Sequence, residues 1–171
     1  MQRLYCVCDV RYVRYTVPWP AWSMESGEHM PDKAKFDGEL VRVTAPGGRV
    51  IIATWCHREL KPTEKRLGLL ENNLLGKISD AYYLPEWCAV SKYVALAKEC
   101  GLEDVRSADW SPYIAPFWPA VVKSALVPRN LLRLLGSGLI TMRAAFASLF
   151  MWLGYSAGLV EFVLVTGRKP K

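Results

Sequence analysis

Residues Trp22–Trp55 decide the fold, and they read WSMESGEHMPDKAKFDGELVRVTAPGGRVIIATW. Pro31 suits the first turn of a helix, where its missing N–H has no intrahelical bond to lose. The apolar residues after it recur at helical spacing on one face: Phe36, Leu40, Val41 and Val43. Ala45-Pro46-Gly47-Gly48 then reverses the chain. The apolar run Val50–Ala53 is typical of a strand buried on both faces. The stretch therefore predicts an α/β unit, with a strand before the helix and a strand after it.

The next segment predicts two further helices and a strand. Thr63 is the expected N-cap of the first helix, because its side-chain oxygen can accept a backbone N–H. Four residues form the apolar stripe of this helix: Leu67, Leu70, Leu74 and Ile78. The second helix opens at Trp87–Ser91 and ends at Cys100-Gly101, with a buried face of Tyr93, Val94, Leu96 and Ala97. Residues 102–110 follow as a strand with Leu102, Val105 and Ala108 pointing inward.

The C-terminal third is rich in proline, aromatic and apolar residues. Pro112, Pro116 and Pro119 predict a shaped loop over residues 111–121, which presents three aromatic side chains: Tyr113, Phe117 and Trp118. Apolar residues dominate residues 120–160, with basic residues between them. This segment is either a helix that lies on a bilayer or a helical pair that covers an active site. Residues 159–170 end the chain as a strand with Phe162–Val165 at its centre.

Composition excludes several classes of function. The chain has 171 residues, which fits one domain or a part of one. Its net charge of +6 comes from scattered basic residues, whereas nucleic-acid binding requires a basic stripe. Five cysteines in no regular framework indicate reduced thiols. Their spacing matches no zinc site, so no metal is expected.

Four segments resemble one enzyme family in the same order along the chain. They are SMESGEHMPDK, APGGRVIIATWCHR, YYLPEWC and DWSPYIAPFWPAV. The chain resembles the gamma-tocopherol C-methyltransferases of plants and algae, which are class I S-adenosylmethionine-dependent enzymes with relatives that methylate alkaloid nitrogens. The resemblance runs from Trp22 to Pro170, about the C-terminal half of such an enzyme. Residues 22–171 are therefore expected to be the C-terminal part of a methyltransferase domain, and residues 1–21 an atypical N-terminal segment.

The resemblance implies an α/β fold, a Rossmann-like methyltransferase sheet truncated at its N-terminal side, with C-terminal helices over the acceptor site. Residues 22–24 would end the fourth strand and residues 50–54 would lie in the fifth. Residues 102–110 would form the sixth strand, and the last strand, the seventh, would be antiparallel and inserted between the fifth and sixth. The glycine-rich loop that follows the first strand in this family is not found in the sequence. The chain is then either a truncated product or a natural remnant that has lost cofactor binding.

The expected function is S-adenosylmethionine-dependent methylation of a prenylated chromanol ring, in vitamin E biosynthesis and in the chloroplast. The expected partner is a small apolar aromatic substrate, with peripheral membrane contact through residues 120–160 and no nucleic acid. Two alternatives remain open. One is a non-catalytic remnant that binds an apolar ligand or a membrane surface. The other is a relative that methylates an alkaloid nitrogen.

The site is expected in the loop after residues 22–24, where the fourth strand meets the cofactor cleft in this family. A base near the phenolic oxygen would assist ring methylation, and Glu25, Glu28 and His29 are candidates. We assign catalysis to His29 and Glu25, although His29 and Glu28 could instead only shape the loop. We expect Ser23, Met24 and Glu25 to contact the cofactor. We expect six aromatic residues to contact the substrate, although any of them could belong to the core instead: Trp55, Tyr83, Trp87, Trp110, Phe117 and Trp118.

Overall fold

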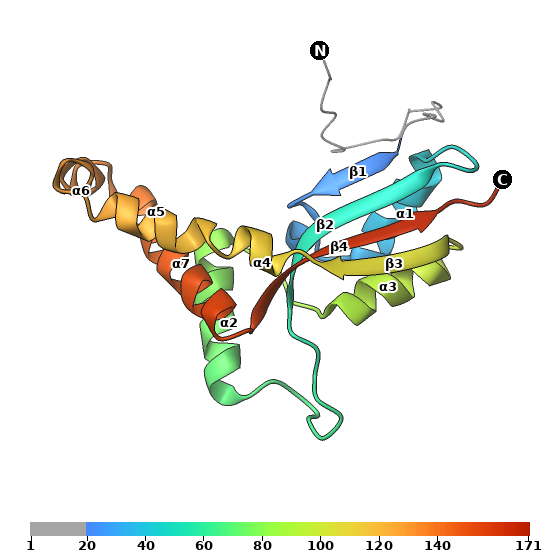
Figure 1. The fold of residues 1–171 in the computed structure, drawn as a ribbon, viewed down its shortest axis with the longest axis horizontal. Helices are drawn as coiled ribbons and strands as arrows, with labels where there is room; N and C mark the ends of the chain where they lie inside the picture. The colour runs from blue at the N-terminus through green and yellow to red at the C-terminus, as the bar shows by residue number, and fades with distance from the viewer. Residues whose placement is uncertain (1–19) are drawn as a thin grey trace, which may run out of the picture.

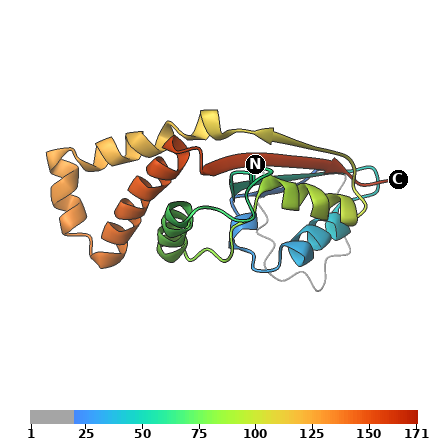
Figure 2. The same cartoon turned by 90° about the horizontal axis from the view of Figure 1, so that it is seen from below.

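The computed structural model describes residues 20–171, so most of the N-terminal segment 1–21 lies outside the described residues. Four strands form one mixed sheet in the order β1-β2-β4-β3. Helices α1 (Lys33–Val43) and α3 (Val90–Glu99) lie on one face of this sheet, and the helices between Ser111 and Ser156, α4–α7, extend away from one of its ends (Figures 1 and 2). The expected α/β architecture is confirmed.

The opening unit forms as its sequence predicts. It consists of β1 (Ala21–Met24), the 3-10 turn η1 (Gly27–His29), α1 (Lys33–Val43) and β2 (Arg49–His57). β1 and β2 are parallel, with Ser23 opposite Ile52. Asp32 caps α1 by accepting from the backbone N–H of Lys35. The helix therefore begins after Pro31, and the expectation that Pro31 lies in its first turn is wrong.

The last strand lies between its neighbours as the family resemblance implies. β4 (Val160–Arg168) is antiparallel to β2 along its whole length, and it pairs on its other side with β3 (Glu103–Asp109), also antiparallel. The turn before β2 is fixed to the end of β4, because Gly47 N donates to the Lys169 carbonyl at 2.9 Å. Gly47 has a φ of 76°, a conformation that glycine adopts without strain.

Two hydrophobic clusters join the sheet to its helices. Side chains that alternate along β2 and β4 pack against α1 and α3 (Val90–Glu99), as the period of two in a strand requires. The fully buried residues of this cluster include Ile52, Tyr93 and Val165. The other cluster lies where α2 (Leu69–Tyr82) and α7 (Leu139–Ser156) meet the ends of β2 and β4. This second cluster supports the helices beyond the sheet.

The helical lobe comprises α2, α4 (Ser111–Ile114), α5 (Phe117–Ala125), α6 (Pro128–Leu135) and α7. α4–α7 are inserted between β3 and β4, and α2 packs against α7. Gly154 in α7 lies close to β4, since a Cβ there would approach Val160 Cγ2 to 2.6 Å. In the part of the chain that the structure describes, no helix combines the length and the apolar character needed to cross a membrane.

Three expectations about local structure are wrong. α2 begins at Leu69 with Gly68 as its N-cap, so Thr63 caps no helix, and Leu70 is 87% exposed. Residues 111–121 form α4 and α5 rather than a loop, because proline is tolerated within the first turn of a helix. Ala108 is exposed rather than inward, because β3 is an edge strand with few neighbours.

Candidate functional site

The candidate site lies at the carboxyl ends of the parallel strands β1 and β2. The loop after β1 is anchored to β2, because Glu25 N donates to the Ala53 carbonyl at 2.8 Å. The chain enters β4 at the same edge, where Arg58 N donates to the Leu159 carbonyl at 2.9 Å. Glu25 is a non-glycine residue with a positive φ of 48°, a conformation that often marks functional loops. Ligands of open α/β sheets bind outside these carboxyl ends.

Glu28 places a buried carboxyl group at this edge. Its side chain is 5% exposed, and Thr54 Oγ1 of β2 donates to Glu28 Oε2 at 2.5 Å. Its second oxygen, Oε1, has no hydrogen-bond partner within residues 20–171. Burial raises the pKa of Glu28, and the hydrogen bond from Thr54 opposes this rise. A carboxylate with a raised pKa and one unpaired oxygen can accept a proton from a ligand.

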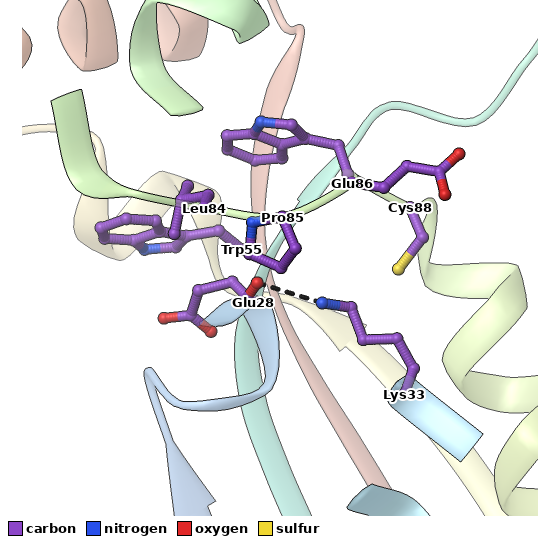
Figure 3. A pocket seen from close by; sticks show the side chains of 8 residues that line it. Glu28, Lys33, Trp55, Leu84, Pro85, Glu86 and Cys88 are labelled. Carbon is purple, nitrogen blue, oxygen red and sulfur yellow. Dashed lines mark hydrogen bonds between the residues drawn. The ribbon is translucent and has the colours of Figure 1, made fainter. Parts of the chain in front are cut away.

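Lys33 holds the Glu28 loop in place from the first turn of α1. Its side chain is buried, and Nζ donates to the carbonyl oxygens of Glu28 at 3.0 Å and Met30 at 2.6 Å. Figure 3 shows the ammonium group pointing at the Glu28 backbone rather than at its carboxylate. Burial lowers the pKa of Lys33. Lys33 therefore positions the loop and leaves Glu28 Oε1 available.

Four aromatic rings pack together beside Glu28. The ring centroid of Trp55 lies 5.6 Å from that of Tyr82 and 6.0 Å from that of Trp118, and Trp118 stacks on Tyr155 at 6.2 Å. Trp55 Nε1 is buried without a partner in the described part of the chain. Trp55 and Glu28 line the same small cavity of about 10 Å³ (Figure 3), room for roughly one water. Two residues that line this cavity thus each carry a buried polar atom without a partner in the described part of the chain.

The predicted catalytic and cofactor residues lie on the loop or at the end of β1. Glu25 and His29 are both exposed. Ser23 is buried, and its Oγ has no partner among the residues described. Met24 is 53% exposed on β1, which is an edge strand in the described sheet. The loop therefore carries these residues at one edge, and their roles stay predictions.

The predicted substrate residues divide into three groups. Trp55 and Trp118 are buried together, and Phe117 contacts Trp118 edge-on at 5.2 Å while remaining 57% exposed. Trp87 joins Trp55 at the small cavity. Tyr83 lies elsewhere, on the last turn of α2 under the guanidinium of Arg143. Trp110 lies at the start of α4 and pairs with Tyr113.

Sequence reasoning overlooked Lys33, Thr54 and Tyr155. Thr54 lies near the carboxyl end of β2, so the rule that located the Glu28 loop could also have located Thr54. Tyr155 belongs to α7, more than a hundred residues from the loop in the chain, and no local pattern distinguishes it. No group of three or more metal-binding side chains occurs within residues 20–171.

Two similar solved structures are those of methyltransferases. A putative sarcosine dimethylglycine methyltransferase from Galdieria sulphuraria is similar at a TM-score of 0.70 and 20% identity, over 94% of this chain and 56% of that one. A geranyl diphosphate C-methyltransferase from Streptomyces coelicolor, solved with Mg2+, geranyl diphosphate and S-adenosyl-L-homocysteine, has a TM-score of 0.69 and 17% identity, over 94% of this chain and 49% of that one. The fold is that of the class I S-adenosylmethionine-dependent methyltransferases.

Curated relatives specify the family. A probable chloroplastic tocopherol O-methyltransferase of Oryza sativa is 57% identical over 150 residues, which are 88% of this chain and 41% of that protein. The chloroplastic tocopherol O-methyltransferase of Arabidopsis thaliana is 52% identical over 87% of this chain and 43% of its own length. The 2-methyl-6-phytyl-1,4-hydroquinone methyltransferase of Synechocystis is 30% identical over 82% of this chain and 45% of its length. No protein-family model matches the chain.

The chain belongs to the tocopherol methyltransferase family, and it corresponds to the C-terminal part of these proteins. It spans about two fifths of the length of the rice and Arabidopsis relatives. The resemblance read from its four sequence segments is confirmed.

One polar group at the end of β1, the Ser23 hydroxyl, suits a hydrogen bond with S-adenosylmethionine. Ser23 has a buried hydroxyl that no other described residue engages, whereas the thioether of Met24, the next residue of β1, is exposed on the opposite face of the strand. Each strand-to-helix connection in residues 20–171 lacks a glycine-rich turn, so the phosphate-loop-like cradle of such folds is not among these contacts.

Proposed function

We propose that this chain takes part in S-adenosylmethionine-dependent methylation of a phenolic ring that carries an isoprenoid tail. The observation that carries the proposal is that Glu28, with its unpaired Oε1, and Trp55, with its unpaired Nε1, line the same cavity at the edge where the strands end. The relatives named for tocopherol and for a phytyl hydroquinone act on compounds of this class. The two tocopherol relatives are both chloroplastic, which agrees with the expected location.

Each residue has a defined part in the proposed reaction. S-adenosylmethionine supplies an electrophilic methyl carbon when it is bound. Glu28 Oε1 accepts the phenolic proton, so electron density rises at the neighbouring ring carbon. The new carbon–methyl bond would form there as the thioether S-adenosylhomocysteine leaves, and the hydrogen of that carbon would then be lost as a proton so that the phenol is restored, for a net release of one proton. Thr54 and Lys33 hold the Glu28 side chain and backbone in position, and Trp55 Nε1 donates to an oxygen of the ring. The buried aromatic wall keeps water away from the nucleophilic carbon.

Calorimetry and a methyl-transfer assay test the proposal together. The purified chain is expected to bind S-adenosylmethionine and to transfer its labelled methyl group to gamma-tocopherol. Nuclear magnetic resonance of the product identifies the methylated atom, because relatives are named for oxygen or nitrogen transfer. If the chain methylates an alkaloid nitrogen and not the phenolic compound, the proposed substrate is wrong and the chain is an alkaloid N-methyltransferase.

The second candidate function is a non-catalytic module that keeps the acceptor-binding lobe. It is favoured by one observation, which is that no glycine-rich turn joins a strand to a helix within the described residues. This function predicts binding of an apolar phenol without binding of S-adenosylmethionine. The calorimetric result above therefore decides between the two functions.

We also propose that α6 and the start of α7 contact an anionic membrane surface. From residue 110 to residue 160 the chain has four basic residues and no acidic one. Leu132, Leu135 and Leu139 are 73%, 59% and 83% exposed, and Arg129 and Arg133 are exposed on the same helix as two of them. An apolar and basic surface of this kind suits the interface of an anionic bilayer.

Vesicle flotation tests this surface. Replacing Arg129 and Arg133 with glutamine is expected to lower affinity for vesicles that contain anionic lipid by roughly 30-fold, since each basic residue contributes about 1 kcal/mol near such a surface. Leu69→Ser with Leu70→Ser is the matched control, because these leucines are 82% and 87% exposed on α2. Equal flotation of the arginine variant and the unchanged chain would exclude α6 as the contact.

A further inference from the structure

Two cysteines that the proposed reaction does not use lie side by side next to the Glu28 cavity. Cys56 is near the carboxyl end of β2, and Cys88 lies two residues before α3. Both are free and buried, and both belong to the hydrophobic cluster between the sheet and α3. The backbone joins their two segments, because His57 N donates to the Cys88 carbonyl at 3.1 Å. The thiols lie within hydrogen-bonding reach of each other, so the pair has the proximity that a disulfide requires.

The two thiols differ in how a reagent can reach them. Cys56 is 0% exposed and belongs to a strand that is paired with β4 at this position. Cys88 is 7% exposed and lines the small cavity beside Lys33 (Figure 3). It lies in the segment Leu84–Ala89, which belongs to no helix or strand, and such segments open locally at a lower free energy than paired strands do. A reagent therefore reaches Cys88 first, and Cys56 only through Cys88.

The two thiols also differ in acidity. The hydrogen bond with Cys56 lowers the pKa of Cys88, burial opposes this decrease, and the positive charges of Lys33 and Lys92 add to it. Cys88 also lies just before the N-terminus of α3, where the helix dipole favours a negative charge. The hydrogen bond with Cys88 and burial both raise the pKa of Cys56. Because the thiolate is the nucleophile in thiol–disulfide exchange, Cys88 is the attacking group of the pair.

We propose that Cys56 and Cys88 form a redox site that reacts with small disulfides such as oxidised glutathione and closes reversibly to an intramolecular disulfide. The Cys88 thiolate attacks one sulfur of oxidised glutathione, whose S–S bond breaks, and the released thiolate takes up the proton that Cys88 lost. Cys56 then attacks the Cys88 sulfur, the mixed disulfide breaks, and the second glutathione leaves with the proton of Cys56. Two electrons and two protons thus pass from the protein to oxidised glutathione, which becomes two glutathione thiols.

The closed disulfide ties a wall of the small cavity to the sheet. The segment Leu84–Cys88 lines that cavity together with Glu28, and the new bond fixes it covalently to β2. The two reduced thiols of the structure fit a reducing compartment, where disulfides form transiently as redox sensors. The redox site does not depend on the proposed methylation, since oxidation of the pair needs neither a methyl donor nor an acceptor.

Incubation of the purified chain with oxidised glutathione tests the site. Peptide mass mapping, after alkylation of the remaining thiols, is expected to show a peptide pair joined through Cys56 and Cys88, which dithiothreitol separates again. Cys100→Ala is the matched control, because Cys100 is a half-buried thiol at the other end of α3, a helix of 10 residues. It therefore lies roughly 15 Å from Cys88 along the helix axis, beyond the reach of a disulfide. We expect Cys100→Ala to form the same cross-link as the unchanged chain.

Two further variants separate the roles of the two thiols, and circular dichroism checks that both are folded. Cys56→Ala is expected to stop at the mixed disulfide and to keep one glutathione on Cys88. Cys88→Ala is expected to lower the rate at which Cys56 is oxidised by at least about tenfold, since a buried thiol with a raised pKa is a poor nucleophile. The proposal is overturned if the unchanged chain keeps both thiols free, or if either of them pairs with another cysteine. Oxidation of Cys56 at an undiminished rate in Cys88→Ala would overturn it as well.

Discussion

Replacing Trp118 with alanine is expected to lower the free energy of unfolding by about 3–5 kcal/mol, the range for truncating a buried aromatic side chain. Trp118 is 6% exposed and joins α5 to β2 and α7 through its contacts with Trp55 and Tyr155. Its removal leaves a cavity that these rings can fill only in part. In a domain of this size the loss corresponds to a fall in Tm of about 6–20 °C.

Phe117→Ala is the matched control for this variant. The neighbouring aromatic residue belongs to the same helix but is 57% exposed, so its truncation is expected to change the free energy of unfolding by less than about 1 kcal/mol. Urea unfolding followed by tryptophan emission and by circular dichroism measures both variants. Equal stability of Trp118→Ala and the unchanged chain would show that Trp118 is not part of the core, and would restore its role as a free substrate contact.

Replacing Glu28 with glutamine is expected to lower the rate of methyl transfer by about 10²- to 10⁴-fold, the usual contribution of a positioned general base. The amide keeps an acceptor oxygen for Thr54 and nearly the same shape, so the loop is preserved. Its oxygen cannot take up a phenolic proton at neutral pH. Single-turnover measurement with gamma-tocopherol and labelled S-adenosylmethionine separates this effect from a change in binding.

The pH profile provides the second measurement on Glu28. Burial raises the pKa of this carboxyl group above its ordinary value of 4.5. A base works only when it is deprotonated, so kcat/KM should rise with pH through that raised pKa and then level off. This acidic limb should be lost in Glu28→Gln. An unchanged limb in the variant would assign the titration to another group.

His29→Ala is the control that compares the two candidate bases. His29 and Glu28 are adjacent in the chain, but His29 is exposed while Glu28 is buried against Thr54. We expect His29→Ala to change kcat/KM by no more than about threefold. A large loss in His29→Ala together with a small one in Glu28→Gln would return the base assignment to His29, as the sequence alone predicts.

Local sequence patterns were sufficient for the elements that surround the site. The apolar run before Trp55 predicted β2 because a strand covered on both faces needs apolar residues at successive positions. The helical spacing from Phe36 to Val41 predicted α1, and Cys100-Gly101 correctly ended α3. The position of β4 between β2 and β3 came from the family resemblance, since no local pattern specifies which strands pair.

Patterns that depend on distant partners were less informative. Leu70 has the spacing of a core residue, but α7 packs on the face of α2 that carries Leu75 and Ile78. The prolines of residues 111–121 looked incompatible with helices, yet they fall at starts and first turns, where proline is accepted. Periodicity indicates that a helix has an apolar face. Which residues of that face are buried depends on the elements that pack against it.

The sequence by itself determined the α/β unit, the methyltransferase family and the loop that carries the site. These follow from short-range spacing and from motifs that remain recognisable without coordinates. Only the tertiary structure decided that Glu28 is buried and that Trp118 belongs to the core. Burial depends on side chains brought together from separate helices and strands, and the burial of Glu28 in turn changes its pKa.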